Sequence, residues 1–217
     1  MQPNMLLLIR LAGLFSSKRA RVEEGGEWCL IDNGQVVQYS KRVMQFTEML
    51  DIVDQQSISQ VVLFVSPDIC PSIKLAVPSK RQSIIRQTVP FLMEENLVED
   101  IDEYHIVCGK WSEGKTTVYY LPRSSMDFIK NFFAESPIKL THLVPEQSCF
   151  EESAGLFDFE GRYYWINDDG TCLIWQEGEK PIGVVIPETI KPQTINKSFT
   201  EELFSKFDIN SNVNLLS

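Results

Sequence analysis

Apolar residues near the start of the chain are arranged as they are in β-strands. The continuous apolar run Met5–Leu11 predicts a buried strand. Two β-rich runs, Glu27–Asp32 and Gln35–Lys41, flank Asn33-Gly34. Both positions of an Asn-Gly pair tolerate positive φ, so this pattern predicts a hairpin.

A helix and a fourth strand are predicted next. Apolar residues at positions 46, 49, 50 and 53 have helical spacing and predict a helix over Phe46–Ile58. The run Gln60–Ser66 is apolar and rich in β-branched residues, which predicts a strand buried on both faces. Three strands, a helix and a strand, in that order, begin a ribonuclease-H-type fold.

The order then becomes strand, helix, strand, strand. Ser72–Val77 predicts the first of these strands, and Ser79 is the expected N-cap of a helix that reaches about Leu97. Pro90 lies inside this helix and is expected to kink or divide it, because proline lacks the backbone N–H. The two strands that follow are expected to form a hairpin and are Tyr104–Trp111 and Lys115–Leu121.

The last part of the chain is predicted to be mostly β. A helix over Ser124–Ala134 precedes the strands, and an amphipathic helix, Thr200–Phe207, follows them. Pairs such as Glu160-Gly161 and Asp169-Gly170 mark turns. The predicted strands are Leu140–Val144, Leu156–Phe159, Arg162–Asn167, Thr171–Gln176 and Gly183–Ile186.

Two segments, Met5–Lys41 and Leu156–Gln176, share a hairpin-rich opening. A duplicated ribonuclease-H-type unit is the architecture of the actin-like superfamily, so we expect a β-rich α/β (α+β) protein with an actin-like fold of three small subdomains. Residues 1–66 and 122–150 are predicted to form the first ribonuclease-H-like subdomain, residues 67–121 an inserted strand-helix-strand-strand subdomain, and residues 151–217 a second, reduced ribonuclease-H-like subdomain.

Charge and composition narrow the classes of function. The chain has 217 residues and a net charge of −10, which argues against nucleic acids and anionic lipids but suits a basic protein partner. No stretch approaches the roughly 20 apolar residues of a membrane-spanning helix. The five cysteines form no Cys-x-x-Cys pair and lie among apolar neighbours, so we expect reduced core residues in a cytosolic compartment.

The sequence holds few groups suited to catalysis. Its two histidines, His105 and His142, lie in strand-like segments without Cys, Asp or Glu at metal-ligand spacing, so we expect structural roles. Neither a nucleophile elbow, a His-Glu-x-x-His helix nor a phosphate-binding P-loop is present. The acidic stretch from Glu94 to Glu103 matches no EF-hand loop and reads as solvated charge or as a protein-binding surface. We therefore expect no catalytic residue, no metal and no cofactor.

Actin-like ATPases bind phosphate with an Asp-x-Gly hairpin between their first and second strands. Here Asp32-Asn33-Gly34 joins the second and third predicted strands, at the opposite end of the sheet. The first connection, Ala12–Glu24, has no Asp before its glycines. Asp168-Asp169-Gly170 lies near the position of a second phosphate loop, but one loop alone cannot clamp a nucleotide. We expect a degenerate nucleotide site.

Residues 77–105 resemble the signature of the L protein of type II secretion systems. The similar features are a proline followed by a short basic and Gln-containing stretch (Pro78 to Gln82), the run Pro90-Phe91-Leu92-Met93-Glu94-Glu95, an acidic run and an aromatic-containing strand from Tyr104. Asn214-Leu215-Leu216 also resembles the Asn-Leu-Leu element that lies shortly before the single membrane-spanning helix of that family.

This resemblance implies a non-catalytic cytoplasmic scaffold of the type II secretion inner-membrane platform in a Gram-negative bacterium. Members of the family have an actin-like fold without a working nucleotide site, recruit the secretion ATPase through its N-terminal domain, and associate with the M protein through membrane and periplasmic parts. We accordingly expect this chain to lie on the cytoplasmic side of the inner membrane, to stop just before the membrane helix, and to be part of a homodimer in the full-length protein.

Seven charged residues of the inserted subdomain are predicted to contact the ATPase: Lys80, Arg81, Arg86, Glu94, Glu95, Glu99 and Asp100. Two alternatives remain. One is an ATP-binding actin-like scaffold of a type IV pilus-type machine. The other is a hydrolase of ribonuclease-H type, which needs clustered carboxylates that Met5–Leu11 and Gln60–Ser66 lack.

Overall fold

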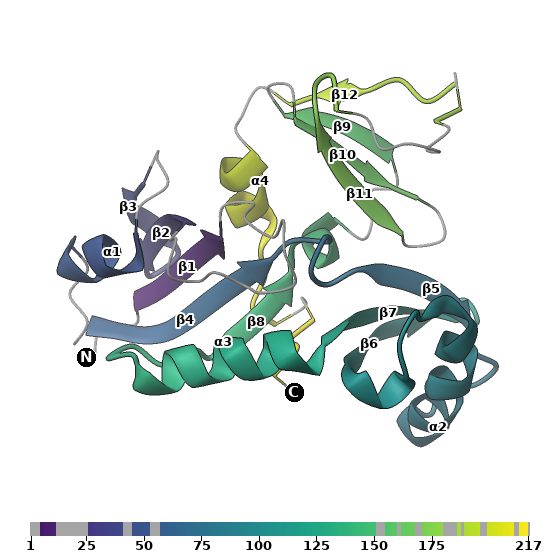
Figure 1. Cartoon of the computed structure of the whole chain (residues 1–217). Helices are drawn as coiled ribbons and strands as arrows, with labels where there is room; N and C mark the ends of the chain where they lie inside the picture. The colour runs from purple at the N-terminus through teal and green to yellow at the C-terminus, as the bar shows by residue number, and fades with distance from the viewer. Residues whose placement is uncertain are drawn as a thin grey trace.

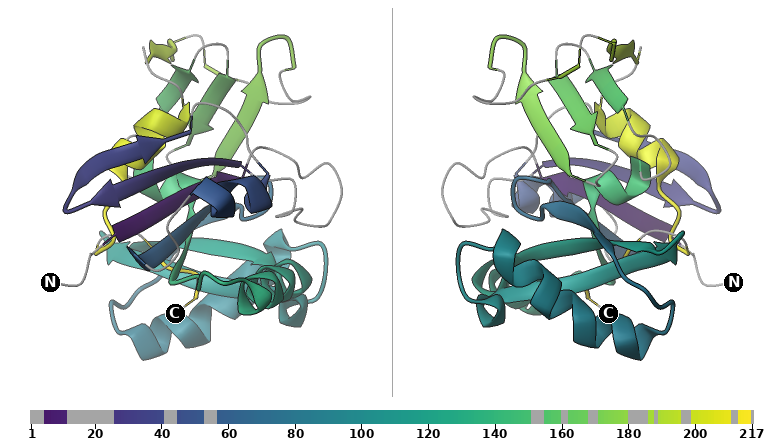
Figure 2. Two further views of the ribbon diagram at one scale, coloured as in Figure 1. Left: turned by 90° about the vertical axis from the view of Figure 1, so that its left-hand side faces the viewer. Right: turned by 90° about the vertical axis from the view of Figure 1, so that its right-hand side faces the viewer.

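The structure is a computed structural model with three β-sheets (Figure 1). The largest sheet lies between the other two in both views of Figure 2. The residues that the structure describes are 5–11, 26–40, 45–52, 57–150, 155–159, 162–167, 171–179, 186–187, 189–195, 199–210 and 213–216.

The first sheet has five strands in the order β3-β2-β1-β4-β8. β1 pairs with β2 antiparallel and with β4 parallel, and β4 pairs with β8 parallel. The β2–β3 turn is a hairpin at Asn33 (φ 48°) and Gly34 (φ 80°), as the sequence predicts, and it needs the left-handed backbone that this pair tolerates. The strands are β1 (Met5–Leu11), β2 (Gly26–Asp32), β3 (Gln35–Tyr39), β4 (Ile58–Val65) and β8 (His142–Pro145).

Strand β4 is buried on both faces, which explains its continuous apolar run. Val61, Leu63 and Val65 belong to a core that includes the helices α1 (Phe46–Ile52) and α3 (Arg123–Glu135). Val62 and Phe64 face a second core on the other side of the sheet. The helix predicted over Phe46–Ile58 is shorter than expected, because Ile58 already belongs to β4.

The second sheet has the antiparallel order β5-β7-β6 and is covered by α2 (Gln82–Met93). The predicted N-cap is wrong, because Arg81 occupies that position and the Ser79 hydroxyl accepts a hydrogen bond from the Arg81 N–H instead. The predicted division at Pro90 is also wrong, since α2 runs through it to Met93. The strands are β5 (Ser72–Ala76), β6 (Tyr104–Ser112) and β7 (Lys115–Pro122).

The third sheet has the order β11-β10-β9-β12 and packs on the first through α4 (Phe199–Lys206). Phe199, Leu203 and Phe204 of α4 share the second core with residues of both sheets. β12 was not predicted, and residues 183–185 of the predicted strand Gly183–Ile186 lie outside the described residues. The strands are β9 (Gly155–Phe159), β10 (Arg162–Ile166), β11 (Cys172–Gln176) and β12 (Gln193–Thr194).

Each sheet falls within one of the three predicted subdomains, whose boundaries stay a prediction. The five cysteines are free thiols: Cys29, Cys70 and Cys172 are buried, whereas Cys108 and Cys149 are only half-buried. Burial raises the pKa of the Cys29 thiol to about 11, so this group is an apolar core residue and not a reactive thiolate.

Candidate functional site

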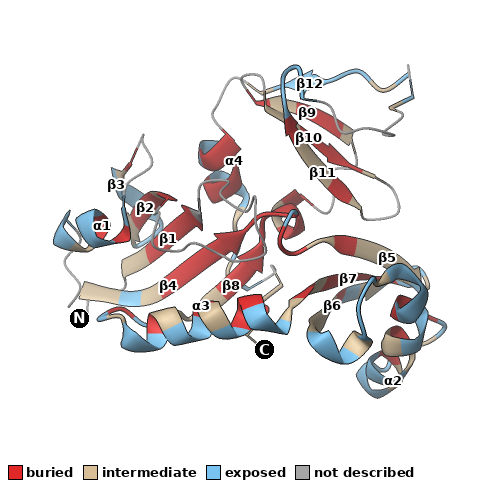
Figure 3. Ribbon diagram, in the orientation of Figure 1, coloured by how far each residue is buried: buried red, intermediate tan, exposed pale blue. Residues whose placement is uncertain are grey.

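The seven predicted contact residues are all exposed and lie along α2 and the segment that follows it (Figure 3). Lys80 and Arg81 precede the helix and Arg86 lies on it. Glu94 and Glu95 lie in the 3-10 turn Glu94–Asn96, and Glu99 and Asp100 precede a second turn, Ile101–Glu103. The structure therefore gives α2 a basic beginning and an acidic end.

Three large apolar side chains lie at that acidic end, and none of them is among the seven contact residues predicted from the sequence. Val98 is 97% exposed, Phe91 72% and Leu92 38%. The spacing of the buried residues explains this exposure, since Ile85, Val89 and Met93 recur every four residues and define the covered face of α2. Phe91 lies on the side of the helix opposite this covered face, whereas Leu92, seven residues after Ile85, lies at its edge and is accordingly less exposed.

The acidic segment after α2 is held in place by several contacts. Leu97 and Ile101 pack on the core between α2 and the second sheet. The Asp100 carboxylate accepts a hydrogen bond from the Asp102 N–H at 3.0 Å, and Arg123 Nε donates to the Asp102 carbonyl at 2.5 Å. The exposed groups are thus presented on a fixed backbone.

A buried ion pair lies at the junction of the first and third sheets. Arg10 Nε, at the end of β1, donates to Glu146 Oε1 at 2.8 Å, and the two side chains are 3% and 0% exposed. Arg10 Nη1 lies 3.4 Å from Glu27 Oε2, and the Arg10 guanidinium lies 4.6 Å from the centre of the Phe199 ring. The Thr200 hydroxyl donates to the same Glu27 carboxylate. One arginine thereby ties β1 to β2, to the turn Glu146–Phe150 and to α4.

The strand register places the Asp32-Asn33-Gly34 hairpin away from this junction. Asp32 pairs with Met5 at the beginning of β1, whereas Arg10 at its end pairs with Glu27. The prediction that this hairpin lies at the opposite end of the sheet is confirmed. The first connection (residues 12–24) and the turn at 168–170 lie outside the described residues.

The C-terminal element Asn214–Leu216 is clamped onto strand β8. Asn214 Oδ1 accepts hydrogen bonds from the N–H groups of Leu143 and Leu216, both at 3.1 Å, and its Nδ2 donates to the Thr141 carbonyl at 3.3 Å. Leu215 is fully buried, and its N–H donates to the Leu143 carbonyl at 2.8 Å. These contacts pair the outer edge of β8 and fix the direction in which the chain leaves the first sheet.

Both histidines lie in strands, as predicted. His105 Nε2 lies 2.7 Å from the Leu215 carbonyl oxygen and carries the proton of this hydrogen bond, because a carbonyl only accepts. His142 Nδ1 lies 3.0 Å from Thr141 Oγ1. Burial lowers the pKa of both rings, which favours the neutral form. His105 joins the second sheet to the C-terminal element.

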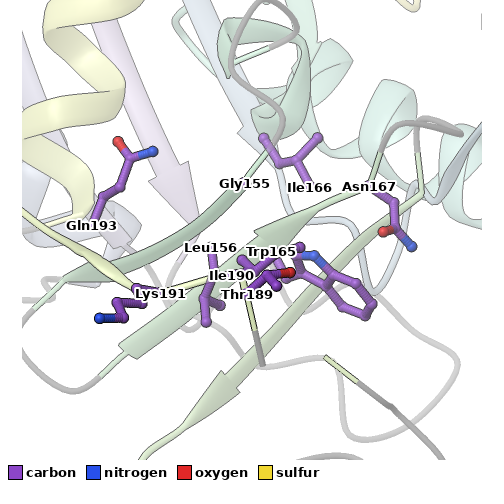
Figure 4. A pocket seen from close by; sticks show the side chains of 9 residues that line it. All are labelled: Gly155, Leu156, Trp165, Ile166, Asn167, Thr189, Ile190, Lys191 and Gln193. Carbon is purple, nitrogen blue, oxygen red and sulfur yellow. The ribbon is translucent and has the colours of Figure 1, made fainter. Parts of the chain in front are cut away.

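A pocket of about 300 Å³ opens at the third sheet (Figure 4). Among its nine described lining residues, Lys191 is the only titratable one. The lining residues are Gly155, Leu156, Trp165, Ile166, Asn167, Thr189, Ile190, Lys191 and Gln193.

Within the described ranges, no three His, Cys, Asp or Glu side chains are grouped so that they could hold a metal ion. No helix in that part of the chain has the length and apolar character needed to cross a bilayer.

The family model of type II secretion system protein L matches residues 14–160, which is more than half of the chain. This chain belongs to the type II secretion system protein L family. The matched range includes the signature at residues 77–105, so the resemblance found from the sequence is confirmed. A comparison with curated proteins finds no match.

Among solved structures, the chain is similar to the cytoplasmic domain of EpsL, an inner-membrane component of the type II secretion system of Vibrio cholerae. The TM-score is 0.70 at 13% identity, over 99% of this chain and 98% of that one. At this identity the similarity shows the fold, and it confirms the actin-like fold class. A second similar structure is a PilM–PilN type IV pilus biogenesis complex, with a TM-score of 0.47 and 9% identity, over 80% of this chain and 61% of that one.

The buried ion pair gives a first prediction. Replacement Glu146→Ala leaves the Arg10 charge buried without its partner and is expected to lower the free energy of unfolding by about 3–5 kcal/mol. Urea unfolding followed by tryptophan fluorescence measures this change. The exposed-site control Glu94→Ala should change the stability by less than about 0.5 kcal/mol. The double variant Arg10→Met/Glu146→Leu should regain most of the loss, and equal losses in the single and double variants would contradict this assignment.

A second prediction concerns pH. The pKa of His105 is lower in the folded chain than its ordinary value, so the unfolded state binds more protons and acidification through the ordinary His range lowers stability. His105→Gln keeps a donor for Leu215 but cannot titrate. We expect its free energy of unfolding to fall less than that of the wild type between pH 7 and pH 5, measured by urea unfolding at each pH. Parallel pH profiles of the two proteins would show that His105 does not contribute.

Proposed function

We propose that this chain is the cytoplasmic part of an inner-membrane protein L, that it holds the secretion ATPase at the inner membrane, and that it acts by binding rather than by catalysis. Membership of the protein L family supports its place in type II secretion. The observation that carries the binding role is the fixed, exposed, charged and apolar surface at α2, where all seven predicted contact residues lie.

The way in which the parts are joined supports the proposal that the chain couples the ATPase mechanically to the membrane assembly. The segment after α2 leads within a few residues to His105, which bonds to the C-terminal element at Leu215. That element is in turn clamped to β8. A force on the α2 surface therefore reaches the end of the chain through packed strands and not through a loose linker. Association with the M protein and a homodimer of the full-length protein belong to the same proposal.

The alternative, an ATP-binding scaffold of a type IV pilus-type machine, has less support. The Arg10 charge at the end of β1 is already compensated by Glu146 and Glu27 inside the protein. Actin-like ATPases bind phosphate at the connection between their first and second strands, and Arg10 lies beside this connection. A triphosphate bound there would have to replace Glu146 and Glu27 as partners of Arg10. A folded protein in which a buried cation loses its carboxylate partners is strongly destabilised.

The recruitment proposal is tested with the N-terminal domain of the ATPase from the same secretion system. The immobilised chain is expected to retain this domain, and the unrelated N-terminal domain of a type IV pilus ATPase serves as the control. Isothermal titration calorimetry then gives the affinity. Absence of retention and of heat at protein concentrations of tens of micromolar would overturn the recruitment role.

The non-catalytic proposal is tested by a separate titration. We expect no saturable heat when ATP with magnesium is added to the chain, and no release of phosphate above that of the buffer. Magnesium-dependent ATP binding in the micromolar range would instead favour the ATP-binding alternative.

A further inference from the structure

We propose that Phe91, Leu92 and Val98, together with the acidic residues around them, form one docking surface for a folded protein domain whose apolar pocket is ringed by Lys and Arg. We refer to these apolar and acidic residues as the 91–103 surface. The inference rests on the proposed function in one respect, since the partner named there is the N-terminal domain of the secretion ATPase. It goes further by assigning the contact to the acidic end of α2 and by stating the chemistry of the partner.

The apolar residues of this surface are unusually open to solvent. Val98 is 97% exposed and Phe91 72% exposed, and Leu92 follows Phe91 near the end of α2. Single exposed apolar residues are common on protein surfaces, but three large ones within eight consecutive residues are an unusual concentration, and exposed apolar groups that gather on a surface mark interaction sites. The buried stripe of Ile85, Val89 and Met93 already completes the local core, so these three are not needed for folding.

The shape of the patch defines the shape of its partner. Phe91 is an exposed phenyl ring at the end of a helix, so it projects from the surface and does not line a groove. Aromatic side chains of this kind contribute most when they enter a well-packed pocket from which water is excluded. The complementary partner is therefore a folded domain with an apolar pocket.

The charges around the patch define the rim of that pocket. Between Gln87 and Gly109 the sequence has no Lys or Arg. Its six acidic residues are all exposed, and Arg123, which donates to the Asp102 carbonyl, offsets one of these charges, so the surface keeps a net negative charge. This field repels nucleic acids and anionic lipids, and a second copy of this chain would bring a further net charge of −10. A partner whose apolar pocket is surrounded by Lys and Arg complements this negative surface. The six acidic residues are Glu94, Glu95, Glu99, Asp100, Asp102 and Glu103.

The backbone of the 91–103 surface is also fixed by contacts within the protein. Leu97 and Ile101 pack on the core between α2 and the second sheet. The contacts of Asp100 and Arg123 with Asp102 fix the turn Ile101–Glu103. A fixed backbone loses little conformational entropy when a partner binds. The basic residues Lys80 and Arg81 lie at the other end of α2, so the structure separates them from this surface and predicts that they contribute less to binding.

The first experiment measures binding of the ATPase N-terminal domain by isothermal titration calorimetry. Phe91→Ala is expected to weaken binding about 30-fold, as the loss of a central aromatic anchor does. Val37→Ala is the matched control, because Val37 is an exposed apolar residue (54%) on β3 in a different sheet, and it should leave the affinity unchanged. Both residues are exposed, so both variants should keep the wild-type unfolding midpoint.

Charge reversal tests the basic rim. Glu95→Lys/Glu99→Lys is expected to weaken binding about tenfold at low salt, with a smaller difference at high salt, because screening weakens exposed charge pairs. The control Glu177→Lys/Glu179→Lys makes the same change of net charge at exposed residues after β11, in a different sheet, and should have little effect. If the wild type binds and these acidic and apolar variants bind equally well, the 91–103 surface is wrong while the recruitment role stands.

A second experiment keeps the inference testable if the ATPase domain does not bind. A photoreactive phenylalanine analogue is placed at position 91, or at position 37 as the control, in the protein in cells that carry the secretion system. The inference predicts an adduct from position 91 alone, on a peptide of one protein with apolar residues next to Lys or Arg. An adduct on a component other than the ATPase would overturn the recruitment role and support the surface, and no adduct above the position 37 control would overturn the surface.

Discussion

The burial of β4 on both faces is the constraint on which the rest of the structure depends. One face carries Val61, Leu63 and Val65, and the core on that side also takes in Tyr119 and Leu121 of the second sheet and Leu215 near the C-terminus. The other face carries Val62 and Phe64, and the core there includes α4 and the third sheet. A strand that must be covered on both sides needs partners from distant parts of the chain. The second sheet, the third sheet and the C-terminal element are thus all positioned by packing around the apolar strand β4.

At the junction of the first and third sheets, directional polar contacts fix how the two sheets lie against each other. Apolar contacts between α4 and β4 can slide, but the Arg10–Glu146 pair and the Glu27–Thr200 hydrogen bond join defined atoms. A buried ion pair contributes little net stability because desolvation is costly, so its value here is that it selects one arrangement. It also places an internally neutralised arginine at the end of β1. In this chain the junction serves to hold two sheets together.

The second sheet, with α2, carries the surface that we propose for a partner. Its own small core is closed by α2, and the end of that helix faces solvent with Phe91, Val98 and a fixed acidic turn. His105 connects the same sheet to the C-terminal element, and Asn214 connects that element to β8. The arrangement suits a scaffold in which a contact made on one side is transmitted through rigid strands to the end of the chain.

Local features of the sequence were sufficient for much of this fold. Asn33-Gly34 tolerates the left-handed backbone of a tight hairpin turn, and the apolar run of β4 indicates a strand buried on both faces, so both could be predicted from neighbouring residues. The signature around residues 77–105 led to the protein L family, and it lies inside the range that the family model matches. The Asn-Leu-Leu element was noticed as a resemblance, but its hydrogen bonds to β8 were not foreseen.

Other features depend on residues far apart in the chain. Arg10 finds its partner 136 positions later, and nothing near Arg10 in the sequence marks Glu146 as that partner. Ser79 has the right identity for an N-cap, yet its hydroxyl accepts a hydrogen bond from the Arg81 N–H and α2 starts only at Gln82. Phe91 and Glu94 belonged to a recognised pattern, but their exposure depends on which face of α2 the second sheet covers. Local backbone preferences and apolar periodicity act between neighbours and can be read along the chain, whereas partners and exposed surfaces are set by long-range packing, which requires the folded structure.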